Sequence, residues 1–345
     1  MRVISLLRAG LGAALLYIAP SAGLLRAQQP AELRVRIELE GNAPLAGALV
    51  ALVDSADRVV IESLSSRTGQ TTLRAPAGIY SLRVRRIGYQ PFVLPGVELP
   101  RPDELRLQVN TPRVVLTTVV VNATAQCGVI THEAATLASV WEEIAKALRS
   151  SQLTAADLSA LGRASLFSRE LGVRGTVLRA DTTWLPAARG RPFAAIDHNS
   201  LVVLGYVRGD EFGGWEYFGP DEAVLLSEGF AQTHCFRVVR EPARKGQLGV
   251  AFEPAPRRRI ADIRGVLWID EETSELREIV FRYVNAGMVT QYEPGGFTRF
   301  RRMQSGAWIV SEWLLRMPKL QSRSRTRRDI MVVGYFERGG ALYDR

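Results

Sequence analysis

The chain has 345 residues, of which 47% are hydrophobic and 23% are charged. This composition excludes an intrinsically disordered protein and is sufficient for two domains that each bury their own core. The formal net charge is +9, and the basic residues are almost all arginine. Arginine clusters at 257–259 and 322–328 would suit nucleic acid, but no aromatic residues are interleaved with them. We therefore expect no nucleic acid partner, and instead solvated loops or contact with anionic lipid or polysaccharide.

Residues 1–27 have the pattern of a secretory signal peptide. Arg2 and Arg8 flank apolar runs, small residues follow, and cleavage is expected after Ala27. The apolar run is shorter than the ~20 residues of a membrane-spanning helix, so a transmembrane anchor is the less favoured alternative. We expect an exported protein of the periplasm or outer envelope, without a transmembrane span after signal removal. Losing Arg2, Arg8 and Arg26 lowers the net charge by three, to +6.

Alternating apolar and polar residues predict a β-sandwich over residues 31–122. Leu33, Val35 and Ile37 alternate with charged residues, which places one set inward and the other in solvent. The same period recurs later, and turn residues separate the runs at intervals typical of a sandwich. The later runs are Tyr80, Leu82 and Val84, then Leu105, Leu107 and Val109; the turn residues are Gly41, Asn42, Gly69, Pro76, Gly78, Gly88 and Pro95.

The stretch from Gly41 to Phe92 resembles the carboxypeptidase regulatory-like domain. The matching positions are Pro44, Gly47, Ala48, Val50, Thr68, Gly69, Pro76, Gly78, Tyr80, Leu82, Gly88, Tyr89 and Pro91. The resemblance implies a seven-stranded transthyretin-like β-sandwich of the kind found at the N-terminus of bacterial envelope proteins. It also implies an accessory module in place of a catalytic domain.

A helical linker segment is expected over residues 123–164. An apolar stripe at helical spacing predicts a helix that packs against a core, and its members are Leu137, Val140, Trp141, Ile144 and Leu148. Thr154 is expected to cap a second, short helix. The β-branched run 112–125 is interpreted as the last sandwich strand or a strand-like linker.

Residues 165–345 predict an antiparallel β-rich domain of the α+β type. Two hairpins are readable, with turns near residues 270–274 and 304–306, and a short helix is expected from Pro220. The hairpin pattern is similar to that of lipoprotein-carrier half-barrels, so we expect a curved sheet with one or two helices packed on it. The whole chain is therefore expected to be mainly β.

Cys127 and Cys235 are the only cysteines. Because export leads to an oxidising compartment, we expect a disulfide between them, with two separate buried thiols as the alternative. A zinc site is not expected, since His234 beside Cys235 lacks the CxxC spacing of such sites.

Motifs for hydrolytic chemistry are incomplete. The histidines are His132, His198 and His234, and none is followed three residues later by the glutamate that zinc carboxypeptidases need. Thr136 stands where an HExxH motif requires its second histidine, and Ser227 lacks the first glycine of a nucleophile elbow.

We accordingly expect no enzymatic activity, no metal and no cofactor. The carboxylates at 270–272 are interpreted as solvated turn residues. If an unrecognised catalytic site exists, its first candidates are His234, His198 and Asp197, and these should share a pocket.

Aromatic residues of the second domain give a signal for ligand binding, because planar side chains stack on sugars or line apolar grooves. The candidates are Trp215, Tyr217, Trp268, Trp308 and Trp313, although core packing is the favoured explanation for most of them. We expect a non-catalytic envelope protein whose sandwich is an interaction or spacer module and whose second domain binds a ligand. An envelope protein, a glycan or a lipid is the expected partner. The alternatives are a carbohydrate-binding protein with a starch-binding-like fold and exposed coplanar aromatics, or an accessory protein of a carboxypeptidase or transport system.

Overall fold

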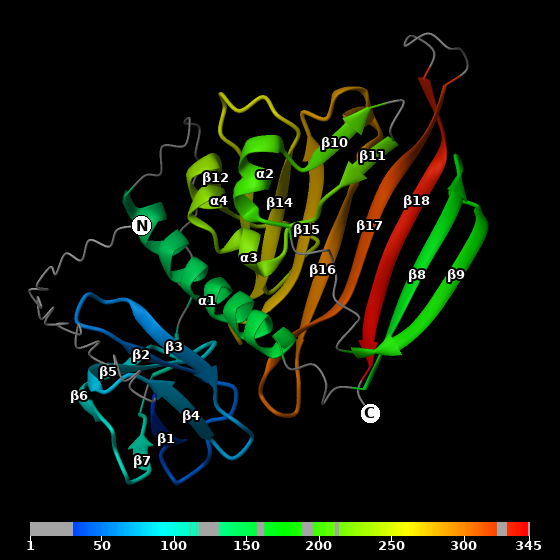
Figure 1. Cartoon of the computed structure of the whole chain (residues 1–345). Coiled ribbons are helices and arrows are strands. Elements are labelled where there is room, and N and C mark those ends of the chain that lie inside the picture. Colours follow the sequence, from blue (N-terminus) through cyan, green and yellow to red (C-terminus); the bar gives the residue numbers. More distant parts are fainter. Residues whose placement is uncertain are drawn as a thin grey trace, which may run out of the picture.

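A small β-sandwich is followed by a larger domain built on one wide sheet (Figure 1). The computed structural model describes residues 30–110, 112–114, 116, 131–156, 162–187, 196–210, 214–322 and 330–343. The expected signal peptide, Cys127 and the arginines within 323–328 lie outside the described residues. The prediction of a mainly β chain is confirmed. No helix in the described part of the chain is both long and apolar enough to cross a bilayer.

Two sheets make up the sandwich, with strand orders β4-β1-β7 and β3-β2-β5-β6. The strands are β1 (Ala31–Glu38), β2 (Leu49–Val53), β3 (Val59–Leu64), β4 (Gln70–Ala75), β5 (Gly78–Arg85), β6 (Phe92–Leu99) and β7 (Leu105–Gln108). Leu33, Val35 and Ile37 of β1 are fully buried, as their alternation predicted, because successive side chains of a strand point to opposite faces. The expected seven strands are confirmed.

The second domain contains a nine-stranded antiparallel sheet within the described residues, with the order β12-β13-β14-β15-β16-β17-β18-β8-β9. Its strands are β8 (Arg163–Gly172), β9 (Val177–Pro186), β12 (His234–Val239), β13 (Gln247–Pro254), β14 (Asp262–Asp270), β15 (Leu276–Val284), β16 (Gly295–Arg302), β17 (Trp308–Ser322) and β18 (Ile330–Tyr343). The predicted hairpins are present as β14–β15 and β16–β17. β8 and β9 precede the other strands of this sheet in the chain, yet β8 pairs with the last of them, β18, and β9 pairs with β8.

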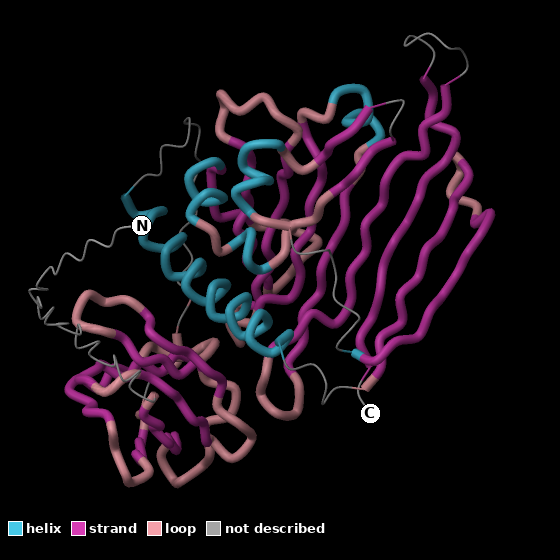
Figure 2. Tube along the Cα trace, viewed as in Figure 1, coloured by secondary structure: helices cyan, strands magenta, loops and turns pink. Residues whose placement is uncertain are grey.

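Helices and a small hairpin cover one face of this sheet (Figure 2). They are α1 (Thr131–Ala156), α2 (His198–Leu204), α3 (Glu222–Leu225), α4 (Glu228–Thr233) and the hairpin of β10 (Val207–Asp210) and β11 (Gly214–Tyr217); a 3-10 helix, η3 (Gly287–Tyr292), follows β15. These covering elements share one apolar core with the sheet. None of these helices covers the end of the sheet formed by β18, β8 and β9 (Figure 2).

The helix α1 belongs to the core of the second domain. Val140, Ile144 and Leu148 of the predicted stripe are fully buried in the cluster that includes the sheet. The expected helix cap at Thr154 is wrong, because Thr154 lies inside α1 and its hydroxyl donates to the carbonyl of Ser150 at 2.8 Å. Neither glycine nor proline interrupts the sequence there, so the helix continues through this position.

A buried ion pair on α1 fastens the sandwich to the second domain. Glu143 and Lys146 are almost fully buried, with Oε1 and Nζ 2.6 Å apart. The backbone N–H of Gly88 donates to Glu143 at 2.7 Å, and Lys146 donates to the carbonyl of Tyr89 at 2.9 Å. Gly88 has a positive φ of 79°, and a Cβ there would lie 2.9 Å from the carbonyl oxygen of Thr273. This Gly88–Tyr89 docking turn is thus held between α1 and the β14–β15 turn.

Candidate ligand-binding site

A cavity of about 730 Å³ lies between the hairpin strand β11 and the sheet strands β17 and β18. This volume is within the range of pockets that hold small ligands. Most of the wall is apolar or aromatic, and the lining residues are Ser168, Gly214, Trp215, Glu216, Tyr217, Phe218, Leu315, Met317, Pro318, Lys319, Leu320, Phe336 and Arg338.

Strand alternation and register build the sheet side of the cavity. Leu315 and Met317 are two residues apart on β17, so their side chains share one face. Across the ladder, Met317 pairs with Phe336 and Leu315 pairs with Arg338. Directly opposite residues of an antiparallel pair project on the same side. The four side chains therefore form one patch, which the sequence analysis did not identify.

The hairpin supplies the aromatic side of the cavity. Trp215 and Tyr217 alternate on β11 and pack against the core of the second domain, where the Tyr217 ring meets Tyr283 edge-on at 5.4 Å. The Trp215 indole nitrogen and the Tyr217 phenol oxygen are buried without a hydrogen-bond partner among the described residues. Burial raises the pKa of Tyr217 to about 12, so the phenol is neutral at physiological pH. Gly209 allows the tight pairing, because a Cβ there would lie 2.0 Å from the carbonyl oxygen of Gly214.

Two cations lie on the cavity wall in different electrostatic environments. Lys319 forms an ion pair with Glu170 of β8, and its Nζ lies 5.4 Å from the centre of the Phe336 ring. Arg338 is exposed, and no carboxylate of the described residues lies within ion-pair distance of its guanidinium. Arg338 is therefore the uncompensated cation of the described wall.

The five aromatic candidates separate into two groups. Trp215 and Tyr217 line the cavity. Trp268 and Trp308 are 1% and 0% exposed and belong to the protein interior, and Trp313 is partly buried against the core of the second domain. The structure therefore brings two of the five candidates together at one site.

Arginines cover many of the aromatic rings of the second domain. Distances from the guanidinium carbon to the ring centre are 4.6 Å for Arg244 and Trp268, 5.8 Å for Arg302 and Trp308, 4.9 Å for Arg163 and Trp184, 4.3 Å for Arg169 and Phe167, 4.4 Å for Arg299 and Phe297, and 4.4 Å for Arg316 and Tyr335. A ring face that holds a guanidinium is not free to stack on a sugar.

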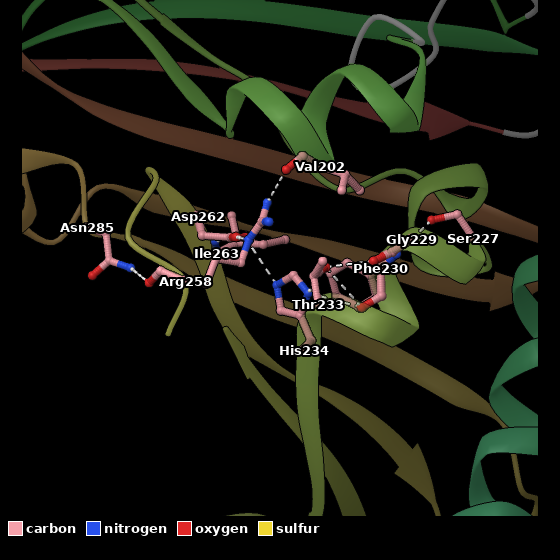
Figure 3. A network of polar contacts seen from close by, with 10 residues as sticks. All are labelled: Val202, Ser227, Gly229, Phe230, Thr233, His234, Arg258, Asp262, Ile263 and Asn285. Atoms are coloured by element: carbon pink, nitrogen blue, oxygen red, sulfur yellow. Dashed lines mark hydrogen bonds and ion pairs between the residues drawn. The ribbon is translucent and has the colours of Figure 1, made fainter. Parts of the chain in front are cut away.

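His234, the first catalytic candidate, lies in a buried polar network (Figure 3). Its side chain is fully buried, and Nε2 donates to Asp262 at 3.1 Å, because a carboxylate can only accept. The Arg258 guanidinium also donates to Asp262 and reaches the carbonyl of Val202 on α2 at 2.7 Å. The His234 ring stacks on Phe230 with centres 4.0 Å apart. The network connects β12, β14, α2 and α4. His234 therefore has a structural role.

The other catalytic candidates are at the surface. Asp197 caps α2 by accepting from the backbone N–H of Ser200, and the exposed His198 ring lies 3.9 Å from the Asp197 carboxylate. None of the three candidates lines the cavity described above. Within the described residues, no cluster of three or more histidine, cysteine or carboxylate side chains is arranged to hold a metal ion.

Comparisons with known proteins identify the N-terminal domain. The family model of the carboxypeptidase regulatory-like domain matches residues 32–112. Comparison with curated proteins finds no match.

Solved structures with weak similarity include a mutant form of the shaft pilin SpaA of Lactobacillus rhamnosus GG, at 9% identity and a TM-score of 0.20 over 71% of this chain and 94% of the pilin. The Bacillus anthracis TIE protein has 11% identity and a TM-score of 0.21 over 88% of this chain and 48% of its own. A protein of unknown function from Bacteroides fragilis has 11% identity and a TM-score of 0.17 over 91% of this chain and 96% of its own. Scores this low carry no argument about function. The match to the family model assigns residues 32–112 to a carboxypeptidase regulatory-like domain, which is a non-catalytic module.

Proposed function

We propose that this chain is an exported, non-catalytic protein of the bacterial envelope whose β-rich domain binds a small apolar ligand. The cavity between β11, β17 and β18 carries this proposal, because its volume and aromatic lining suit such a ligand. The signal-like residues 1–27 support export.

In this proposal the regulatory-like sandwich is a rigid interaction or spacer module. The ion pair of Glu143 and Lys146 holds the docking turn, and Glu62 of β3 binds Arg149 of α1 at 2.6 Å. Contacts on two separate parts of the sandwich restrict its rotation against the second domain. A partner bound to the sandwich would thus be held in a fixed orientation relative to the cavity.

A carbohydrate-binding function has less support. Trp184 and Tyr343 are each 49% exposed, but their rings are inclined by 46° and Arg163 covers Trp184. Sugar binding by stacking needs accessible ring faces. The exposed aromatic pair therefore does not form the coplanar platform that the alternative requires.

Titration with the neutral apolar dye N-phenyl-1-naphthylamine tests the proposal. The Met317→Trp variant fills the cavity from β17, and Met288→Trp places the same side chain at a partly exposed site that does not line it. We expect saturable fluorescence enhancement in the wild type and in Met288→Trp, and at least a tenfold weaker affinity in Met317→Trp. No dye binding by the wild type, or equal affinity in the two variants, would reject the cavity as the binding site.

A further inference from the structure

The cavity is apolar in its depth and charged at its rim. Leu315 on the sheet side is 5% exposed, whereas Phe336 is 39% exposed and its neighbour in the patch, Arg338, is also exposed. An apolar interior beside a wet, charged edge matches a molecule that has both an apolar chain and a polar head.

Of the two cations that line the cavity among the described residues, only one forms an ion pair with a carboxylate. Glu170 neutralises Lys319. Glu216 alternates with Trp215 and Tyr217 on β11, so its side chain projects away from the sheet, in register with Arg208. Within the described residues Arg338 forms no ion pair, and Glu216, the one carboxylate among the lining residues, projects away from the sheet.

The arginines on the other face of the same strands are arranged differently. Arg316 of β17 and Arg169 of β8 both lie within 4.0 Å of Glu337, at 4.0 and 3.9 Å. Each also stacks on an aromatic ring, at 4.4 and 4.3 Å. The Arg338 guanidinium, on the same sheet, has neither a carboxylate nor an aromatic ring as a partner in the part of the chain that the structure describes.

We infer that the cavity takes a single-chain amphiphile with an anionic head group, the chain lying against Leu315, Met317 and Trp215 and the head group pairing with Arg338. This inference rests on the proposed function and specifies its ligand class. A guanidinium binds carboxylate or phosphate oxygens through two parallel hydrogen bonds, which a neutral alcohol cannot reproduce. Carboxylate and phosphate share this chemistry, so both belong in the test.

The test is displacement of N-phenyl-1-naphthylamine by dodecanoate and dodecyl phosphate, each below its critical micelle concentration, and by 1-dodecanol below its solubility limit. In the wild type we expect at least one anionic amphiphile to bind ten or more times as tightly as the alcohol. In Arg338→Gln the preference should fall below threefold. Arg316→Gln, on the opposite face of β17, is the matched control and should keep the preference. The stronger of the two anions would identify the head group.

Two results would overturn the inference while leaving the proposed function intact. One is dye binding by the wild type with equal affinities for the anions and the alcohol. The other is an anion preference that survives Arg338→Gln. Absence of dye binding by the folded wild type, with no binding of any amphiphile by calorimetry, would instead reject both.

Discussion

Arginine has a specific packing role at many positions of this protein. Its planar guanidinium lies over aromatic rings and also pairs with carboxylates, as Arg299 does with Phe297, Glu278 and Glu312. The ammonium group of lysine has no such planar face. The sequence contains very little lysine, and this use of arginine on the sheet is consistent with that composition.

Two tyrosines in contact provide a matched test of the hairpin packing. The Tyr283 hydroxyl donates to the carbonyl of Phe218 at 3.0 Å, whereas the buried Tyr217 hydroxyl has no partner among the described residues. Removing a hydrogen-bonded hydroxyl costs about 1 kcal/mol, and removing an unpaired buried one costs little or nothing. We expect urea unfolding of the ligand-free protein to show a lower free energy of unfolding for Tyr283→Phe by about 1 kcal/mol. For Tyr217→Phe we expect no decrease, and an equal loss in both variants would contradict this packing.

The buried network around His234 makes a second prediction at the residue scale. Asp262 is fully buried and accepts from His234, from Arg258 and from the backbone N–H of Ile263. An asparagine keeps one acceptor oxygen for His234 and Ile263, but its amide N–H faces the Arg258 donor and the buried negative charge is lost. We therefore expect a loss of about 3 kcal/mol. Denaturant unfolding measures the loss, and Asp181→Asn, at an exposed ion pair, is the control. A loss no larger than that of the control would show that the network contributes little to stability.

At the scale of elements, α1 connects the two domains through charge as well as apolar packing. Burial raises the pKa of Glu143 above 4.5, while Lys146 and the Gly88 N–H lower it less. The folded state then holds the proton more tightly than the unfolded chain. The contribution of Glu143 to stability is therefore fully present below about pH 4.5 and decreases as the pH rises through the folded-state pKa.

Comparing the wild type with Glu143→Gln isolates this effect. We expect the free energy of unfolding of the wild type, relative to the variant, to fall as the pH is raised from about 4 to about 7, measured by urea unfolding at each pH. Glu142→Gln, at the adjacent exposed carboxylate, is the control for a general change in charge. A difference that grows with pH would mean that the attraction of Lys146 outweighs burial.

Local signals predicted the elements better than their ends. The stripe from Leu137 to Leu148 predicted α1, but Thr154 was mistaken for a cap because a threonine hydroxyl can equally bond back to a carbonyl within a helix. The helix expected from Pro220 is instead two short helices, since Ser227 accepts from the Phe230 N–H and caps α4. Whether such a residue caps a helix or lies inside it depends on packing against residues that are distant in the sequence.

At the scale of the whole molecule, long-range strand pairing explains why only part of the cavity could be predicted. The sandwich follows from alternation and turns that are close in sequence, and Trp215 and Tyr217 were candidates as conspicuous aromatics. The opposing wall depends on the register that places Arg338 beside Leu315 and Ser168, and β8 lies far from β18 in the chain. No local pattern specifies that register.

The predicted disulfide would connect the segment after the sandwich to β12, where Cys235 lies. Closing a loop of this size stabilises a fold by ~4 to 5 kcal/mol in the chain-entropy model. We expect the melting temperature of oxidised wild-type protein to fall on reduction with dithiothreitol, and Cys235→Ser to melt at that lower temperature with or without reductant. Equal melting of oxidised and reduced wild type, together with two titratable thiols after denaturation, would show that the bond does not form.

Native mass spectrometry of the mature protein, purified from an oxidising export compartment, tests the central claim of a ligand-binding cavity most directly. We predict that one amphiphile remains bound per chain in the wild type and in Met288→Trp, and that it is absent from Met317→Trp. A bare chain in all three proteins after incubation with dodecanoate, or equal retention in both variants, would contradict the claim.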